Sequence, residues 1–187
     1  MATLIIKTTD FVGFQGLAQS INTTPVLQAY IDLYEKRYLM WLLGETLGNL
    51  FIADLVNGVP QTQRFIDLFN SFDKQNTFDN WNFCWDYDCN YQNRKGMRHS
   101  DGIKQILLNC VFYHYVTDTD AQHTQSSVQQ SQSDTSKNAD AWRFGERRFN
   151  TGLDSWEDIR WFILINKTIY PEYVFTRMPT AKYSSIL

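Results

Sequence analysis

Residues 23–55, TTPVLQAYIDLYEKRYLMWLLGETLGNLFIADL, carry the strongest helical pattern of the chain and decide its fold class. Thr24 is a candidate N-cap, and Pro25 suits the first helical position, where a missing N–H costs nothing. Large apolar side chains then recur every three or four residues, as on one face of an amphipathic helix. They are Leu27, Tyr30, Ile31, Tyr34, Tyr38 and Leu42. We expect Gly44 to end or kink this helix.

Similar patterns predict further helices on both sides of the chain centre. A second helix carries Leu47, Leu50, Phe51 and Leu55 and stops at Asn57-Gly58. A third covers 61–72, with Phe65, Ile66, Leu68 and Phe69 inward. A fourth covers 101–116, with Ile103, Ile106, Leu107, Cys110, Val111, Tyr113 and His114 on its apolar face. A short helix is expected in 141–150, followed by one that starts at a cap on Asp154 or Ser155 and stops at Pro171.

Three segments are candidates for strands. Residues 3–8 and 173–176 are short and rich in β-branched or aromatic side chains. In 81–87, aromatic residues alternate with polar ones, which is the period of an extended segment. The fold class predicted from the sequence is therefore mainly α. We expect a bundle of about four or five helices in one domain over 1–187, with minor β strands and a long extended polar arm.

The composition is that of an ordinary globular protein, with one unusual feature. Of 187 residues, 43% are hydrophobic and 20% charged, while aromatics reach 16%, which points to large buried contacts within the fold or between copies. The net charge of −3 gives no global sign of nucleic-acid binding. The sequence shows no secretory signal and no apolar run long enough for a membrane span. Its three cysteines are an odd number, which argues against a framework of disulfides. We therefore expect the protein to fold in a reducing cytoplasm.

Residues 117–141, TDTDAQHTQSSVQQSQSDTSKNADA, form the segment that we call the polar arm. They include no aromatic side chain and one aliphatic side chain larger than alanine, Val128. Unstructured connections longer than about 12–15 residues are uncommon and are usually functional or disordered. A segment with so little apolar surface cannot offset its ordering entropy alone, so we expect it to order against a partner.

The candidates for catalysis or metal binding are weak. Cys84 and Cys89 form one loose pair, whereas structural zinc sites usually show two close pairs. The acidic residues of 73–88 lack the spacing of a calcium loop, and no nucleophile elbow or phosphate-binding motif is present in the sequence. A glycosidase needs only two carboxylates, so a carbohydrate-binding or hydrolysing module that uses 78–91 remains an alternative. We expect no enzyme activity, no cofactor and no metal.

Two basic clusters lie next to aromatic segments. One comprises Arg94, Lys95 and Arg98, and the other Arg143, Arg147 and Arg148. Such clusters are usually solvated faces or pair with acidic residues of a neighbouring chain. The second interpretation is that they face a nucleic-acid passage, where phosphate contacts need charge but no base readout.

Three segments, in this order, resemble the head-to-tail connector proteins of tailed bacteriophages. YEKRYLMWLLGETL resembles the helix and turn near the start of these adaptor or ring proteins. Residues 101–136 resemble their helix that ends in aromatics before a polar arm, and LDSWEDIRWFILINKTIYPEYVF resembles their C-terminal helix. The likeness is greatest to ring proteins from the necks of crAss-like phages. It does not extend to the aromatic segment 78–91.

This resemblance implies a structural protein of the virion neck, assembled in the cytoplasm of the host bacterium. The protein would form a ring with other copies of itself, commonly of twelve, that docks on the phage portal protein. The ring would carry the downstream tail or neck ring proteins and extend the channel for non-specific passage of double-stranded DNA. The arm would contact a neighbouring subunit or the portal through residues that include His123, Thr124, Gln125, Val128, Gln130 and Asp134.

Overall fold

The computed structural model describes residues 4–12, 23–75, 97–125 and 141–174. This part of the chain is mainly helical, as predicted, with short strands in two hairpins. The elements in chain order are η1 (Thr8–Asp10), α1 (Thr23–Leu43), α2 (Glu45–Ala53), β1 (Leu55–Val56), β2 (Val59–Pro60), α3 (Gln63–Phe69), β3 (Phe72–Gln75), β4 (Met97–Ser100), α4 (Gly102–Gln125) and α5 (Ala141–Ile165).

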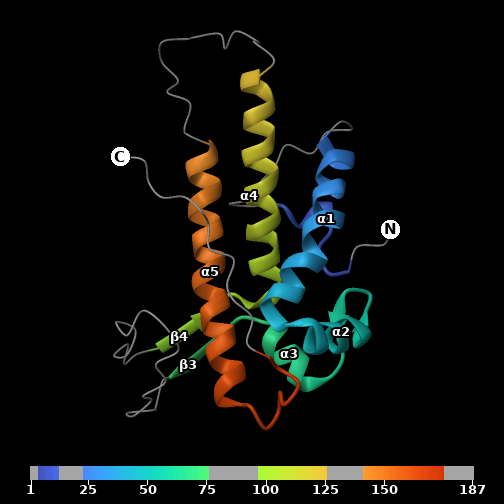
Figure 1. Ribbon diagram of the computed structural model, residues 1–187, viewed down its shortest axis with the longest axis vertical. Coiled ribbons are helices and arrows are strands. Elements are labelled where there is room, and N and C mark those ends of the chain that lie inside the picture. The colour runs from blue at the N-terminus through green and yellow to red at the C-terminus, as the bar shows by residue number, and fades with distance from the viewer. Residues whose placement is uncertain (1–3, 13–22, 76–96, 126–140, 175–187) are drawn as a thin grey trace.

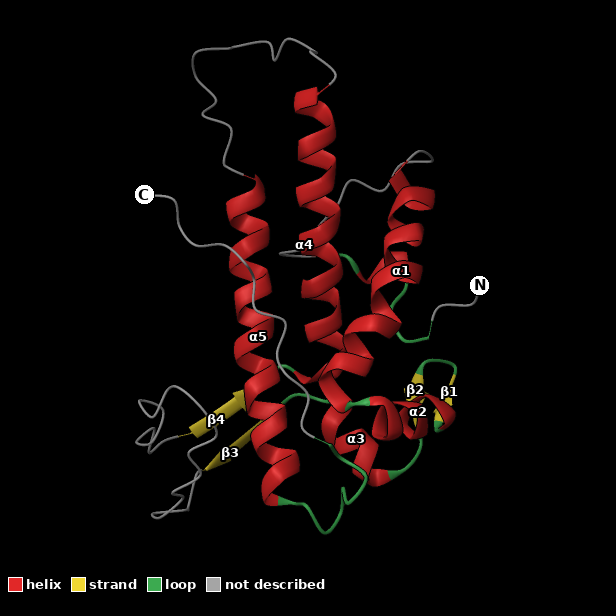
Figure 2. Ribbon diagram, viewed as in Figure 1, coloured by secondary structure: helices red, strands yellow, loops and turns green. Residues whose placement is uncertain are grey.

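The three long helices form a layer with α4 in the middle, between α1 and α5 (Figure 1). Helices α1 and α5 run in one direction and α4 runs in the other. At one end of the layer, which we call the base, lie α2, α3 and the two hairpins (Figure 2). The opposite end, the tip, holds the first residues of α1 and α5 and the last residues of α4.

The break between α1 and α2 occurs at Gly44, as the sequence predicted. Gly44 has φ 77°, in the left-handed region that glycine adopts without a steric penalty. The apolar stripe of α1 is also confirmed. Leu27, Ile31, Tyr38 and Leu42 are buried, because this face packs on α4 and α2.

The expected strand at 3–8 is wrong for the residues that are described. Residues 4–7 are not paired with another strand, and Thr8–Asp10 is a 3-10 turn. The buried carboxylate of Glu35 on α1 accepts hydrogen bonds from the backbone N–H groups of Leu4, Ile5 and Ile6, at 2.9, 2.7 and 2.6 Å. One side chain of α1 therefore satisfies the donors that a neighbouring strand would otherwise have satisfied.

The hairpin β1–β2 was not predicted, although its turn carries the relevant signal. Asn57 and Gly58 have φ 53° and 82°, as a two-residue turn of type I′ requires at both central positions. The sequence predicted a helix stop at this dipeptide, and the structure shows that it is also the turn of a hairpin. Leu55, expected in the second helix, pairs instead with Pro60 across the hairpin.

A second hairpin joins β3 to β4, with Phe72 opposite Ser100 and Asp73 opposite His99. Strand β4 lies against α5. The strand predicted at 81–87, with Cys84 and Cys89, lies outside the described residues.

Helix α5 is continuous through the position where we expected a new helix to begin. Ser155 is buried inside α5 and is not an N-cap. The helix continues because Gly145 and Gly152, seven residues apart, face α4 and allow the two backbones to approach. A Cβ atom on Gly152 would lie 3.3 Å from Cβ of Asn109 and 3.6 Å from the carbonyl oxygen of Ile106. This packing overrides the local signal for a helix start at Asp154 or Ser155.

The C-terminal boundary also differs from the prediction. Helix α5 ends at Ile165, six residues before Pro171, and neither Tyr173 nor Val174 is in a strand. The following turn is attached to α3, since the hydroxyl of Tyr170 donates to the carbonyl oxygen of Arg64 at 2.7 Å. Arg64 also forms an ion pair with Glu172 at 3.1 Å.

Much of the aromatic content is packed within one chain. Ring pairs join α1 to α4, α4 to α5, α2 to α3, and β3 to α5; they are Tyr34–His114, Tyr113–Phe149, Phe51–Phe65 and Phe72–Phe162. Such pairs contribute about 0.5–1.5 kcal/mol each beyond their buried area. Within the described residues, many of the aromatic side chains are thus used in the core.

Candidate functional site

Arg98, a candidate for an interface or channel surface, is used inside the molecule. Its Nη1 lies 2.8 Å from Oδ1 of Asp158, and the two side chains are only 17% and 16% exposed. The guanidinium also lies over the ring of Trp161, 5.7 Å from its centroid. Arg98 therefore connects β4 to α5 through contacts within the chain. Arg94 and Lys95 lie outside the described residues.

The second basic cluster lies at the tip, in the first two turns of α5. Arg143 and Arg147 are exposed, and their spacing of four residues places them on one face. Arg148 lies over the ring of Phe144, 5.1 Å from its centroid. Cations at a helix N-terminus are disfavoured by the helix dipole. Arg143 and Arg147 are the exposed members of this cluster.

The first part of the polar arm is helical rather than extended. Helix α4 continues through 117–125, so His123, Thr124 and Gln125 belong to its last turn. Side-chain contacts with α1 explain the longer helix: the hydroxyl of Tyr30 donates to Asp118, and the rings of Tyr30 and Tyr115 meet edge to face at 5.6 Å. Val128, Gln130 and Asp134 lie outside the described residues.

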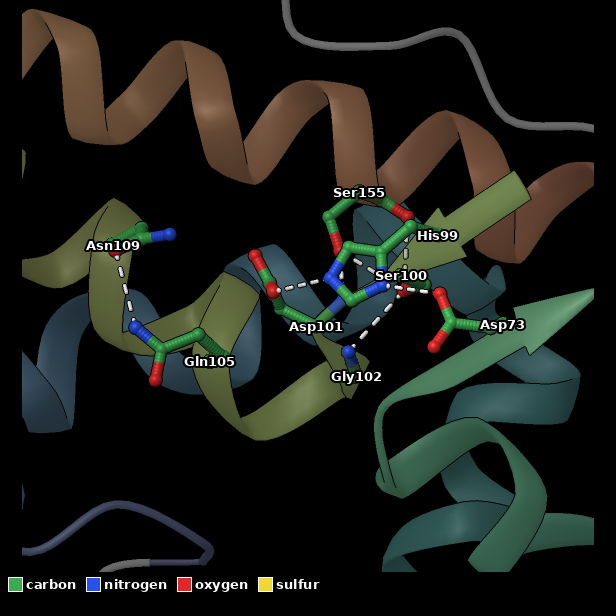
Figure 3. Close-up of polar contacts among 8 residues, drawn as sticks. All are labelled: Asp73, His99, Ser100, Asp101, Gly102, Gln105, Asn109 and Ser155. Atoms are coloured by element: carbon green, nitrogen blue, oxygen red, sulfur yellow. Dashed lines mark hydrogen bonds and ion pairs between the residues drawn. The ribbon is translucent and has the colours of Figure 1, made fainter. Parts of the chain in front are cut away.

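A cluster of polar side chains at the base joins β3, β4, α4 and α5 (Figure 3). Nδ1 of His99 lies 2.8 Å from Asp73, and Nε2 lies 3.0 Å from Asp101. The hydrogen bond with Asp73, followed by that with Asp101, raises the pKa of His99 above its usual value. Both ring nitrogens therefore face carboxylates, which favours the imidazolium form.

Two serines in the same cluster attach the start of α4 to the middle of α5. The hydroxyl oxygens of Ser100 and Ser155 lie 2.9 Å apart, and the backbone N–H of Asp101 donates to Ser155 Oγ at 2.7 Å. The N–H of Gly102 donates to Ser100 Oγ at 3.2 Å. The cluster contains serine, histidine and aspartate, but His99 is hydrogen-bonded to two carboxylates and to neither serine. These contacts do not form the serine–histidine pair of a nucleophilic triad.

An open groove of about 400 Å³ lies beside this cluster, between η1, the end of α3 and the start of α4. Its charged groups are Asp10, Asp101 and Lys104, and Lys104 Nζ lies 3.0 Å from Asp10 Oδ1. This pair links η1 to α4. The groove thus carries charges of both signs, and one of its two carboxylates is paired with Lys104.

Among the described residues, no group of three histidine, cysteine, aspartate or glutamate side chains could hold a metal ion. Cys110 is fully buried on α4, as its place on the apolar stripe predicted, and burial strongly raises the pKa of its thiol. In the same part of the chain, none of the helices has the length and apolar character needed to cross a membrane.

Comparison with known proteins identifies the family of the chain. The model of a family of unknown function, DUF6712, matches residues 52–181, and the chain therefore belongs to that family. The match extends from the end of α2 through α5 and includes the polar arm. Searches of curated proteins and of solved structures gave no match.

Proposed function

We propose that the protein is a structural component of the neck of a tailed bacteriophage, where copies form a ring between portal and tail. One observation carries the proposal. The end of α4 and the start of α5, which flank the least apolar segment of the chain, both lie at the tip, far from the base that α2 and α3 build (Figure 1). The polar segment is thus attached, in sequence, to the tip ends of two helices that pack on each other.

This arrangement suits a protein that orders on assembly. Helices α4 and α5 are fixed to each other by close packing at Gly145 and Gly152, and to α1 by Tyr30 and His114. Their tip is therefore a defined anchor for the arm. Ordering the arm costs roughly 1–2 kcal/mol per residue, which contacts with a neighbouring subunit or the portal would offset.

The basic side chains at the tip are compatible with the same function. Arg143 and Arg147 are exposed and follow the arm in sequence. In a ring, these side chains would face a neighbouring subunit or the DNA that passes through. Contacts with DNA phosphates would not require recognition of its bases. The order of the three segments that resemble connector proteins supports the assignment independently of the geometry.

The carbohydrate-binding alternative depends on 78–91, which lies outside the described residues. Nothing in the groove at the base favours it, because the groove carries one apolar ring, Phe69, beside its charged groups. Sugar sites commonly use aromatic platforms with convergent polar groups. We therefore retain a single proposed function.

Replacing part of the arm tests the proposal. Residues 127–139 are exchanged for a Gly/Ser linker of equal length in the phage that encodes the protein, and a second variant keeps the composition of 127–139 but scrambles its order. We expect both variants to keep the wild-type urea-unfolding midpoint as free proteins, since the exchange leaves α4 and α5 intact. Incorporation into particles should fall at least tenfold with the Gly/Ser linker. Infectious particles with normal amounts of this variant would contradict the role of the arm.

A further inference from the structure

The outward faces of α1 and α5 carry charges in opposite order. On α1, the exposed Asp32 is followed by the exposed Lys36 and Arg37. On α5, the exposed Arg143 and Arg147 are followed by the exposed Asp154. Half-buried Glu146 and Glu157 also belong to α5, next to this face. From tip to base, the exposed charges of α1 are thus negative and then positive, whereas the exposed charges of α5 are positive and then negative.

The two helices lie at opposite edges of the layer and run in the same direction (Figure 1). If copies are placed side by side in one orientation, α5 of one copy faces α1 of the next and their charge orders are complementary. The spacing agrees as well. With a rise of about 1.5 Å per residue, Arg147 and Asp154 are separated by about 10 Å, and Asp32 and Arg37 by about 8 Å. Flexible lysine and arginine side chains absorb this difference.

Apolar side chains accompany the charges. Val26 and Leu33 on α1 are 48% and 60% exposed, and Ala29 lies exposed between them. Phe144 on α5 is 38% exposed. Apolar residues within a rim of charges are the usual composition of a protein–protein interface. Single exposed apolar residues are common on monomers, so it is the combination with complementary charge that indicates a partner.

We propose that the outward face of α1 in one copy binds the outward face of α5 in the next copy. This interface rests on the proposed ring function. The outward faces of α1 and α5 would be the surfaces through which copies join into the ring. Because the two faces differ and lie on opposite edges, the contact is heterologous and continues from copy to copy until a ring closes. A symmetric dimer would instead pair one face with itself.

The size of the two faces predicts a weak contact. The exposed part of α1, from 25 to 37, is about 20 Å long and a helix is about 10 Å wide. A standard interface buries about 800 Å² per partner, so this contact alone is smaller than a stable dimer requires. The free protein is therefore expected to be monomeric at micromolar concentration, with rings forming where the portal aligns the copies.

Charge reversal in the phage tests the interface. We expect Asp32→Arg and Arg147→Glu each to lower the amount of the protein per particle at least tenfold, and the double variant to restore most of it. Lys167→Glu, an exposed charge reversal beyond the end of α5, is the control and should have no effect. If both single variants lower the amount of the protein per particle and the double variant does not restore it, the two faces bind some other partner. The proposed interface between copies would then be wrong.

Cross-linking gives a second readout. In particles that carry both Leu33→Cys and Asn150→Cys, oxidation should link successive copies into a ladder, and neither single variant should do so above background. A chain that is present in the neck but shows neither a ladder nor charge rescue would overturn the interface and leave the proposed function intact. A wild-type chain absent from particles would overturn both.

Discussion

The imidazole of His114 on α4 is stacked on the ring of Tyr34 on α1, with centroids 3.9 Å apart and ring planes 3° apart. On the same residue, Nε2 is hydrogen-bonded to the hydroxyl of Tyr38 at 2.7 Å. Burial is the main cause that lowers the pKa of His114. The neutral ring is therefore part of the contact between α1 and α4.

This contact predicts a loss of stability in acid. In the unfolded chain, His114 is protonated near its ordinary pKa of 6.5. In the folded chain its pKa is lower, so protonation requires a lower pH. The contribution of His114 thus falls as pH drops below about 6.5. His114→Phe keeps a stacked ring and cannot titrate, but it leaves the Tyr38 hydroxyl unpaired. We expect a cost of about 1–2 kcal/mol at pH 7.5 and a smaller difference from wild type at pH 5, by urea unfolding. An equal difference at both pH values would contradict this account.

His99 should show the opposite dependence. Its pKa is raised by hydrogen bonds to Asp73 and Asp101, so its contribution to stability is present at low pH and is lost as pH rises through the raised value. Nuclear magnetic resonance titration of the ring protons should give a pKa above 6.5. Asp73→Asn should lower this pKa and leave that of His114 unchanged. A wild-type value at or below 6.5 would show that the carboxylates do not hold the imidazolium.

The spacing and type of neighbouring residues predict the helices, but they do not predict how the helices pack on one another. The stripe from Leu27 to Leu42 and the break at Gly44 follow from spacing and from one glycine, and both are confirmed. The position of Ser155 shows the limit. Its residue type indicates a helix start, yet close packing of Gly152 on α4, more than 40 residues earlier, decides in favour of one continuous helix.

Gly152 therefore provides a direct test of the α4–α5 contact. Gly152→Leu must displace Asn109 or separate the helices, since even a Cβ atom would lie 3.3 Å from Asn109. Overpacking of this kind typically costs about 1–3 kcal/mol. The exposed Asn150→Leu, two residues earlier on α5, is the matched control and should change the free energy of unfolding by less than about 0.5 kcal/mol. Equal effects of the two variants would mean that α5 does not pack through this glycine.

Glu35 should be among the most sensitive polar positions. Its carboxylate holds three backbone N–H groups of residues 4–6, and it is only 3% exposed. Glu35→Ala leaves these donors without their acceptor, which should cost on the order of 3 kcal/mol. Lys36→Ala, the exposed neighbour, is the control. Hydrogen exchange at Ile5 and Ile6 should accelerate in the first variant alone, and unchanged protection would argue against this role.

The candidate site was harder to predict than the helices, for a comparable reason. Arg98 belongs to a visible basic cluster, but its partner Asp158 lies 60 residues away and no local pattern reveals the pair. The arm was recognised from composition, whereas its boundary depended on Tyr30 of α1 contacting Asp118. Sequence patterns identify segments with unusual composition, and tertiary contacts decide which of their residues remain available to a partner.

The most direct test of the central claim is a cryo-electron microscopy reconstruction of the neck in purified particles of the encoding phage. The proposed function predicts density for this chain in a closed ring next to the portal, commonly of twelve copies, with 126–140 lying along an adjacent subunit or the portal. Within the ring, α1 of each copy should face α5 of the next. A neck fully accounted for by other proteins, with this chain absent from the particle, would contradict the assignment.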